Sequence, residues 1–280
     1  MSKLKNFPPV YYITLEDSVV RQIDMESQLE SLDVYDYTRV IAYDGRVTDY
    51  TKDPNITGRC KGDLDSGQIA TVYSHLKAIH EWYHNSDTDA AIFLEDDMIL
   101  TTCQYWTFTW DDVIKRIYER DWNCVQLALI RADDADIPIN EKDIQFRRRS
   151  FYNWSAGAYM IRRKYAKHLL DYYMPDENKL NLTIYSYDNY SPYIENVLYI
   201  AGRPEEYTLP LFVENTNYTS TFYKHFPKGM VGRHKQGQFN SSAFVHNWWK
   251  ENGHRVNIDK LMEFKETWYW EKGDDDIETT

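Results

Sequence analysis

The 280-residue sequence has little cysteine and no long apolar run. Its three cysteines, Cys60, Cys103 and Cys124, form no Cys-x-x-Cys pair, which argues against a structural zinc site. A sparse, odd number of cysteines predicts reduced thiols in a cytoplasm rather than a disulfide framework. No segment approaches the roughly 20 apolar residues of a membrane span, and Pro8 and Pro9 stand where a signal peptide needs its apolar stretch. We therefore expect a cytoplasmic protein without a membrane span.

Positive charge is also in short supply. The chain has 32 Lys and Arg against 44 Asp and Glu, a formal net charge of -12. No excess of cations exists to displace the counterions of a phosphate backbone, so we expect no nucleic-acid partner. The hydrophobic share of 42% is that of a globular protein, and aromatic residues, at 16%, are abundant.

Short apolar runs alternate with helical patterns in the first hundred residues. Strand-like runs at 10–15 and 40–42 flank a helical pattern at about 19–32, whose apolar positions include Val20, Ile23 and Leu29. A second helix is indicated from Ser66, a plausible N-cap, by apolar residues spaced three and four apart from Ile69 to Tyr83. This alternation predicts an α/β fold.

Further elements follow along the chain. Runs at 125–130 and 156–161 predict buried strands, and helical patterns cover 164–173 and 258–270. Residues 232–235 (Gly-Arg-His-Lys) resemble a glycine-flanked cationic turn, which could contact a diphosphate or be an exposed basic loop. Arg147 to Arg149 resemble a solvated run, although a mobile loop over a ligand would have the same sequence. No internal repeat or linker divides the chain.

An acidic triplet is the most informative local feature. The apolar run at 90–94 has the length and composition of a central parallel strand, and Glu95, Asp96 and Asp97 follow it directly. Open α/β sheets bind ligands at the carboxyl ends of their strands. Strand geometry would turn Glu95 and Asp97 to one side and Asp96 to the other. Such carboxylates can bind Mg²⁺ or Mn²⁺, although a solvated acidic turn would have the same sequence.

Seven segments carry a resemblance that extends over about residues 10–222. In chain order they are VYYITLEDSVVRQ, IAYDGR, GQIATVYSHLKAIHEW, AAIFLEDDMIL, SAGAYMIRRKYAKHLL, YIENVLY and LPLFVEN. Together, and in this order, they resemble glycosyltransferase family 25, the lipooligosaccharide and collagen-type galactosyl- and glucosyltransferases. Two departures stand out: Glu195 replaces an aspartate of the family pattern, and Ala70-Thr71 replaces its glycine-cysteine pair.

The resemblance implies a GT-A-like fold and a defined reaction. The fold would be a Rossmann-type mixed sheet flanked by helices, formed by residues 1–222, with 223–280 as a C-terminal extension ending in a flexible acidic tail at 273–280. The reaction would be inverting transfer of a hexose, glucose or galactose, from a UDP-sugar to a glycan, lipid-linked or protein-linked acceptor. Mn²⁺ or Mg²⁺ would neutralise the leaving diphosphate.

The resemblance also assigns site residues. Asp97 and Glu95 would hold the cation in a DxD-like motif, and a histidine near the C-terminus would be a further ligand, with His225, His234 and His246 as candidates. Glu195 is the first candidate for the base and Asp188 the second. The donor would be bordered by these residues: Thr14, Leu15, Arg21, Asp44, Gly45, Ser74, His75 and Asp96.

Plainer interpretations remain open for these residues. Arg21 could be a surface arginine of a helix, Asp44-Gly45 a tight turn and Ser74-His75 part of a helix core. Two other functions also stay open: a non-catalytic carbohydrate-binding protein on a transferase scaffold, and a metal-dependent phosphohydrolase or nuclease. Aromatic rings could stack on acceptor sugars, with Trp154, Tyr190, Tyr193 and Trp248 as candidates.

Overall fold

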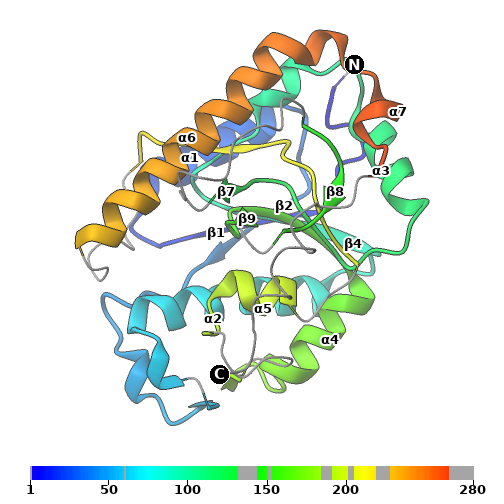
Figure 1. The fold of residues 1–280 in the computed structure, drawn as a ribbon. Coiled ribbons are helices and arrows are strands. Elements are labelled where there is room, and N and C mark those ends of the chain that lie inside the picture. Colours follow the sequence, from blue (N-terminus) through cyan, green and yellow to red (C-terminus); the bar gives the residue numbers. More distant parts are fainter. Residues whose placement is uncertain are drawn as a thin grey trace, which may run out of the picture.

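The computed structural model describes residues 2–59, 61–131, 144–150, 153–183, 191–200, 205–218 and 228–264, without the side chains of residues 131 and 228–234. In this part of the chain a seven-stranded mixed sheet, ordered β2-β1-β4-β10-β6-β12-β8, lies between two layers of helices (Figure 1). The predicted α/β class with a mixed, helix-flanked sheet is confirmed. Its strands are β1 (Val10–Thr14), β2 (Tyr37–Ile41), β4 (Ala90–Glu95), β6 (Cys124–Gln126), β8 (Arg147–Arg148), β10 (Ala158–Arg162) and β12 (Glu206–Thr208).

Three short strand pairs add to this sheet. They join β3 (Ile56–Thr57) with β11 (Leu180–Asn181), β5 (Met98–Ile99) with β13 (Val213–Glu214), and β7 (Ile130–Arg131) with β9 (Asn153–Trp154). The α-helices are α1 (Val19–Ser31), α2 (Ser66–Asn85), α3 (Trp110–Tyr118), α4 (Arg163–Tyr173), α5 (Ile194–Ile200), α6 (Lys228–Asn252) and α7 (Ile258–Leu261). Short 3-10 helices are η1 (Tyr50–Lys52), η2 (Lys61–Asp63), η3 (Thr101–Tyr105) and η5 (Gly253–Arg255).

Strand β4 is central and buried on both faces. It pairs in parallel with β1 and antiparallel with β10. Ile92 and Leu94 pack in the core on one face, and Ala91 and Phe93 in the core on the other. Helices α1, α3 and α6 cover the first face and α2, α4 and α5 the second (Figure 1). A strand covered on both sides has no polar face, which explains its continuous apolar sequence.

Helix α2 begins differently from the prediction. Asp65, not Ser66, is the N-cap: its carboxylate accepts from the Gln68 backbone N–H at 2.8 Å, and the Gln68 side chain returns to the Asp65 N–H at 2.9 Å. This reciprocal capping box satisfies two amides that the first turn leaves free. The Ser66 hydroxyl is used elsewhere, donating to the Thr48 carbonyl at 2.7 Å.

Helix α1 has the predicted extent but a different buried face. Val20 and Ile23 are 66% and 60% exposed, whereas Gln22 is buried beside Met25 and Leu29. Gln22 is accommodated because its amide donates to the Leu15 carbonyl at 2.8 Å and accepts from Arg39 at 2.8 Å. Apolar spacing alone could not foresee a glutamine with two tertiary partners.

Two predictions for charged segments are wrong. Residues 232–235 form no turn but lie within α6, which packs on the sheet through residues such as Trp249, whose indole N–H donates to the Pro210 carbonyl at 2.9 Å. Arg149 is not solvated but 3% exposed, because its guanidinium stacks on the Tyr199 ring and donates to the Asn153 carbonyl at 2.7 Å.

The remaining sequence expectations have mixed outcomes. Helix α7 ends at Leu261, well before residue 270, and the tail at 273–280 lies outside the described residues. The division at residue 222 stays a prediction. Cys103 and Cys124 are buried free thiols, whereas Cys60 is outside the described residues. None of the described helices is long and apolar enough to cross a membrane.

Gly45 offers a test of how the loop after β2 packs on α2. A Cβ at Gly45 would lie 2.6 Å from both the Gly67 Cα and the Ser66 carbonyl oxygen, whereas nothing lies within 4 Å of one built at Gly62. We expect Gly45→Ala to lower the free energy of unfolding by about 1–3 kcal/mol through overpacking, and Gly62→Ala to leave it nearly unchanged. Urea unfolding of both variants measures this, and equal stabilities would contradict the packing described.

Candidate active site

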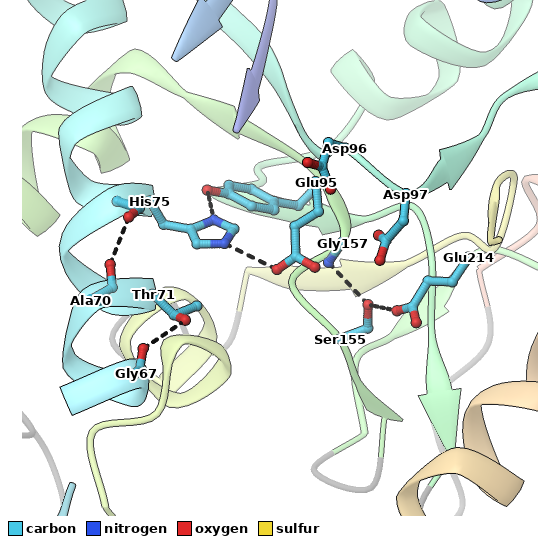
Figure 2. A network of polar contacts seen from close by, with 12 residues as sticks. Gly67, Ala70, Thr71, His75, Glu95, Asp96, Asp97, Ser155, Gly157 and Glu214 are labelled. Carbon is cyan, nitrogen blue, oxygen red and sulfur yellow. Dashed lines mark hydrogen bonds and ion pairs between the residues drawn. The ribbon is translucent and has the colours of Figure 1, made fainter. Parts of the chain in front are cut away.

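The acidic triplet occupies the carboxyl end of β4. Glu95 is the last residue of the strand, and Asp96 and Asp97 turn the chain into β5. The Asp97 carbonyl accepts from the Asn215 N–H at 2.7 Å, which ties the turn to the end of β13. Glu95 and Asp97 extend to one side and Asp96 to the other (Figure 2), as strand geometry predicts.

Asp96 is held by the first β-strand and the first helix. Thr14, at the end of β1, donates from Oγ1 to Asp96 Oδ2 at 2.6 Å, and Arg21 in α1 donates to Oδ1 at 2.9 Å. Burial raises the pKa of Asp96, and these two donors oppose that rise. Arg21 is therefore not a free surface arginine, since it also reaches Asp97 Oδ2 at 3.3 Å.

Asp97 is a buried carboxylate with acidic neighbours and one unsatisfied oxygen. It is 8% exposed, and its Oδ1 atom is buried with no hydrogen-bond partner among the described residues. Burial and then the charges of Glu95, Glu214 and Asp96 raise its pKa well above the ordinary value. A buried carboxylate oxygen without a donor is costly, so an added cation or proton would stabilise it.

Glu95 is oriented by a buried histidine. His75 in α2 is 1% exposed, with Nε2 at 3.2 Å from Glu95 Oε1 and Nδ1 at 3.0 Å from the Tyr159 hydroxyl of β10. Burial keeps the pKa of Tyr159 well above its usual value, so the phenol retains its proton. The arrangement that satisfies all three groups has Tyr159 donating to Nδ1 and Nε2–H donating to Glu95.

Glu214, which the sequence analysis did not single out, completes the cluster. Ser155 Oγ donates to its Oε1 at 2.8 Å and Gln238 Nε2 to its Oε2 at 2.6 Å. Burial, followed by the charge of Glu95, raises its pKa to about 7, and the two donors oppose this. The glutamate ends a two-residue strand, too short for a sequence pattern to reveal.

The backbone beneath Glu214 is strained. Ser155 has φ of +92°, a conformation that side chains rarely adopt. Its carbonyl accepts from Gln126 at 3.0 Å and from the Tyr199 hydroxyl at 3.1 Å, while its Oγ accepts from the Gly157 N–H at 3.0 Å. A Cβ at Gly157 would lie 3.3 Å from Glu214 Oε1. Several bonds thus fix the serine that orients Glu214.

Of the two candidate bases, only Glu195 lies in the described part of the chain. Glu195 is partly buried in the first turn of α5, and its pKa is raised by burial and further by the charge of Glu95. It therefore lies within electrostatic reach of the acidic cluster. Asp188 is outside the described residues.

The other predicted donor residues flank the first two strands. The Leu15 carbonyl receives the Gln22 amide, and Asp44 forms an ion pair with Arg46 at 2.7 Å, which lowers the pKa of Asp44. Gly45 packs against the start of α2. Ser74 is buried and structural in its contacts, donating to the Ala70 carbonyl at 2.6 Å and accepting from the Tyr43 N–H at 2.8 Å.

A divalent cation bound at this cluster would have few protein ligands. Among the described residues, no three His, Cys, Asp or Glu side chains are grouped closely enough to hold a metal ion. Mg²⁺ commonly takes one or two carboxylates and completes its shell with phosphate and water, and the unpartnered Asp97 Oδ1 meets that need. His234 lies in α6, and its side chain is outside the described part.

These features define an α/β protein with a cluster of buried carboxylates at the carboxyl ends of its sheet strands. The profile described as "Glycosyltransferase family 25 (LPS biosynthesis protein)" matches residues 7–185, more than half of the sequence. The chain belongs to glycosyltransferase family 25. A comparison with curated protein sequences finds no match.

Solved structures with partial similarity include several glycosyltransferases. One, involved in glycosylation of the major capsid of PBCV-1, is 9% identical, with 81% of this chain and 97% of that one covered and a TM-score of 0.35. GlyE of Streptococcus pneumoniae TIGR4 is 12% identical, with 89% of this chain and 66% of that one covered and a TM-score of 0.34. An active-site mutant of LgtC is 9% identical, with 83% of this chain and 85% of that one covered and a TM-score of 0.36. TM-scores this low add nothing to what the chain itself supports.

The raised pKa of Glu214 predicts how stability depends on pH. Its folded-state pKa, about 7, exceeds its ordinary 4.5, so its stabilising contribution is complete below about pH 4.5 and is lost as pH rises through about 7. In chelator-containing buffer, Glu214→Gln should therefore become more stable relative to wild type between pH 5 and 8, by up to about 3 kcal/mol. In the variant, the Gln238 side chain can rotate so that its amide oxygen accepts a hydrogen bond from the amide introduced at position 214.

Thermal unfolding of wild type and variant across this pH range measures the effect. Glu119→Gln is a suitable control, because the Glu119 side chain is 64% exposed, and its stability should parallel wild type. A stability difference for Glu214→Gln that stays constant with pH would contradict the elevated pKa.

Proposed function

We propose that this protein is an inverting, metal-assisted hexosyltransferase that moves glucose or galactose from a UDP-sugar to a hydroxyl of a glycan, lipid-linked or protein-linked acceptor. The main observation in support is Asp97 Oδ1, which is buried and has no hydrogen-bond partner in the described chain. It lies in a carboxylate cluster at the carboxyl end of the central strand β4. Membership of glycosyltransferase family 25 supports the reaction class. The donor class, the hexose and the stereochemistry follow from the family resemblance.

The acidic cluster would hold the cation at the end of β4. Asp97 would be the principal ligand and Glu95 would lie beside it, oriented by His75. Mn²⁺ or Mg²⁺, when bound, would offset the charge of the leaving diphosphate. Thr14 and Arg21 keep the Asp96 carboxylate turned toward the end of the first strand. In that position Asp96 would border the donor while Asp97 holds the cation.

Glu195 would take the proton of the acceptor hydroxyl. Inversion is a single displacement, so one base is enough, whereas a retaining glycosidase requires two close carboxyl groups. The upward pKa shift of Glu195, caused by burial and by Glu95, moves it toward the working pH of a general base. Trp154 and Tyr193 are 39% and 40% exposed, and their rings could stack on acceptor sugars.

A screen of nucleotide sugars by thermal shift, with and without Mn²⁺, tests the function. A UDP-hexose should raise the unfolding temperature in the presence of metal, because a ligand that binds only the folded state stabilises it. Transfer to an acceptor mixture, followed by mass spectrometry, then establishes catalysis. Sugar binding without transfer or donor hydrolysis would favour a carbohydrate-binding protein, and cleavage of a phosphodiester would favour a phosphohydrolase.

Asp97→Asn should abolish most transfer without loss of the fold. The amide removes the anionic oxygen but suits a site where burial already disfavours charge, so stability should stay equal or rise. We expect kcat to fall by about 100-fold or more. Asp121→Asn, beside Lys164 with a side chain 67% exposed, is the control and should keep wild-type turnover. Normal turnover of Asp97→Asn would exclude its role.

Glu195→Gln separates proton transfer from donor binding. We expect kcat to fall by about 100-fold or more because the acceptor hydroxyl loses its base, while the thermal shift produced by the donor remains. Steady-state kinetics with a saturating donor provides the measurement. If kcat is unchanged, the base lies elsewhere, with Asp188 the next residue to substitute.

A further inference from the structure

We propose that Glu214 is a direct ligand of the divalent cation, paired with Asp97 across the β5–β13 strand pair. This inference rests on the proposed function, since it concerns the same cation. It replaces the expected histidine from the C-terminal part, His234, by a carboxylate that the sequence did not indicate.

Backbone pairing places Glu214 beside the acidic turn. Glu214 is the register partner of Met98, the residue after Asp97, and the neighbouring Asn215 donates to the Asp97 carbonyl at 2.7 Å. Two adjacent strand contacts thus fix the distance between the two backbones. The carboxylates of Asp97 and Glu214 lie next to each other at the end of this pair (Figure 2).

Asp97 presents an oxygen that nothing in the described chain satisfies. Asp97 is more than nine-tenths buried, and Arg21 reaches its Oδ2 at 3.3 Å but leaves Oδ1 without a donor. Two buried carboxylates repel each other unless a cation or a proton lies between them. A divalent cation would satisfy Oδ1 and offset both charges.

Glu214 is oriented in the way that metal-binding carboxylates are. Each of its oxygens accepts one hydrogen bond, from Ser155 at 2.8 Å and from Gln238 at 2.6 Å, and keeps further lone pairs. Outer hydrogen bonds of this kind fix the direction of metal ligands. The strained φ of Ser155 and the lack of a side chain at Gly157 both serve this placement.

Two carboxylates are enough for such a site. Glu95 Oε1 already accepts a hydrogen bond from His75 Nε2 at 3.2 Å, so the Glu95 carboxylate is turned toward α2. Diphosphate oxygens and water can supply the remaining positions around Mg²⁺ or Mn²⁺. The pair is therefore consistent with the absence of any three-residue group among the described side chains.

Mn²⁺ binding to the purified chain tests the proposal without an activity readout. The free Mn²⁺ signal in electron paramagnetic resonance is titrated with wild type, Glu214→Gln, Glu214→Asp and Glu119→Gln, with the metal alone. We expect Glu214→Gln to weaken binding by about 10-fold or more and Glu214→Asp to weaken it less, whereas Glu119→Gln, whose side chain is 64% exposed, should match wild type. Circular dichroism confirms that each variant is folded.

The outcomes separate this proposal from the proposed function. Saturable binding that is equal in wild type and Glu214→Gln overturns the role of Glu214 alone. Glu214→Gln with normal Mn²⁺ affinity but lost transfer also overturns it and makes Glu214 a proton acceptor. If wild type does not bind Mn²⁺, the cation site itself is overturned. Transfer measured in the presence of a chelator then shows whether the transferase activity needs a metal.

Discussion

Repulsion among four carboxylates at one end of the sheet is the interaction on which the site depends. Asp97 and Glu214 have elevated pKa values because burial removes the water that would screen them, and their acidic neighbours add to the cost. The neighbouring side chains compensate the negative charge of the four carboxylates to different extents. Arg21 neutralises the Asp96 side, His75 supports Glu95, and only neutral donors reach Glu214 among the described residues. The deficit of positive charge is therefore concentrated at Asp97 Oδ1, where a bound cation would act.

The fold brings these groups together from distant parts of the chain. Thr14 ends β1 and Glu95 ends β4, and because these strands are parallel neighbours their carboxyl ends meet at one edge. Helix α2 brings His75 from one layer and α6 brings Gln238 from the other, on opposite faces of the sheet (Figure 1). The site thus depends on both layers, and α6 contributes to it although it lies beyond the segment that matches the family.

Local chemistry made much of this predictable. The apolar run of β4 and the following triplet, and the spacing of α2 with His75, specify elements without knowledge of tertiary contacts. The triplet's alternation also follows from strand geometry. Glu214 could not be found in this way, since a two-residue strand has no periodicity and its importance comes from pairing with β5. The same holds for Gln22 in α1, which is buried because its side chain has hydrogen-bond partners outside the helix, Leu15 and Arg39.

The destabilisation caused by the carboxylate cluster helps to distinguish a catalytic site from a site that only binds sugar. Buried carboxylates with raised pKa values destabilise a folded protein at neutral pH, and backbone strain at Ser155 adds to that cost. A scaffold that only binds sugar could use neutral amides at Asp97 and Glu214, which would fit the same space without repulsion. Stacking surfaces such as Trp154 would be unaffected by that change. Two carboxylates placed where their charge is most unfavourable are therefore more consistent with a site that binds a cation, as proposed for this transferase, than with one that only stacks on sugars.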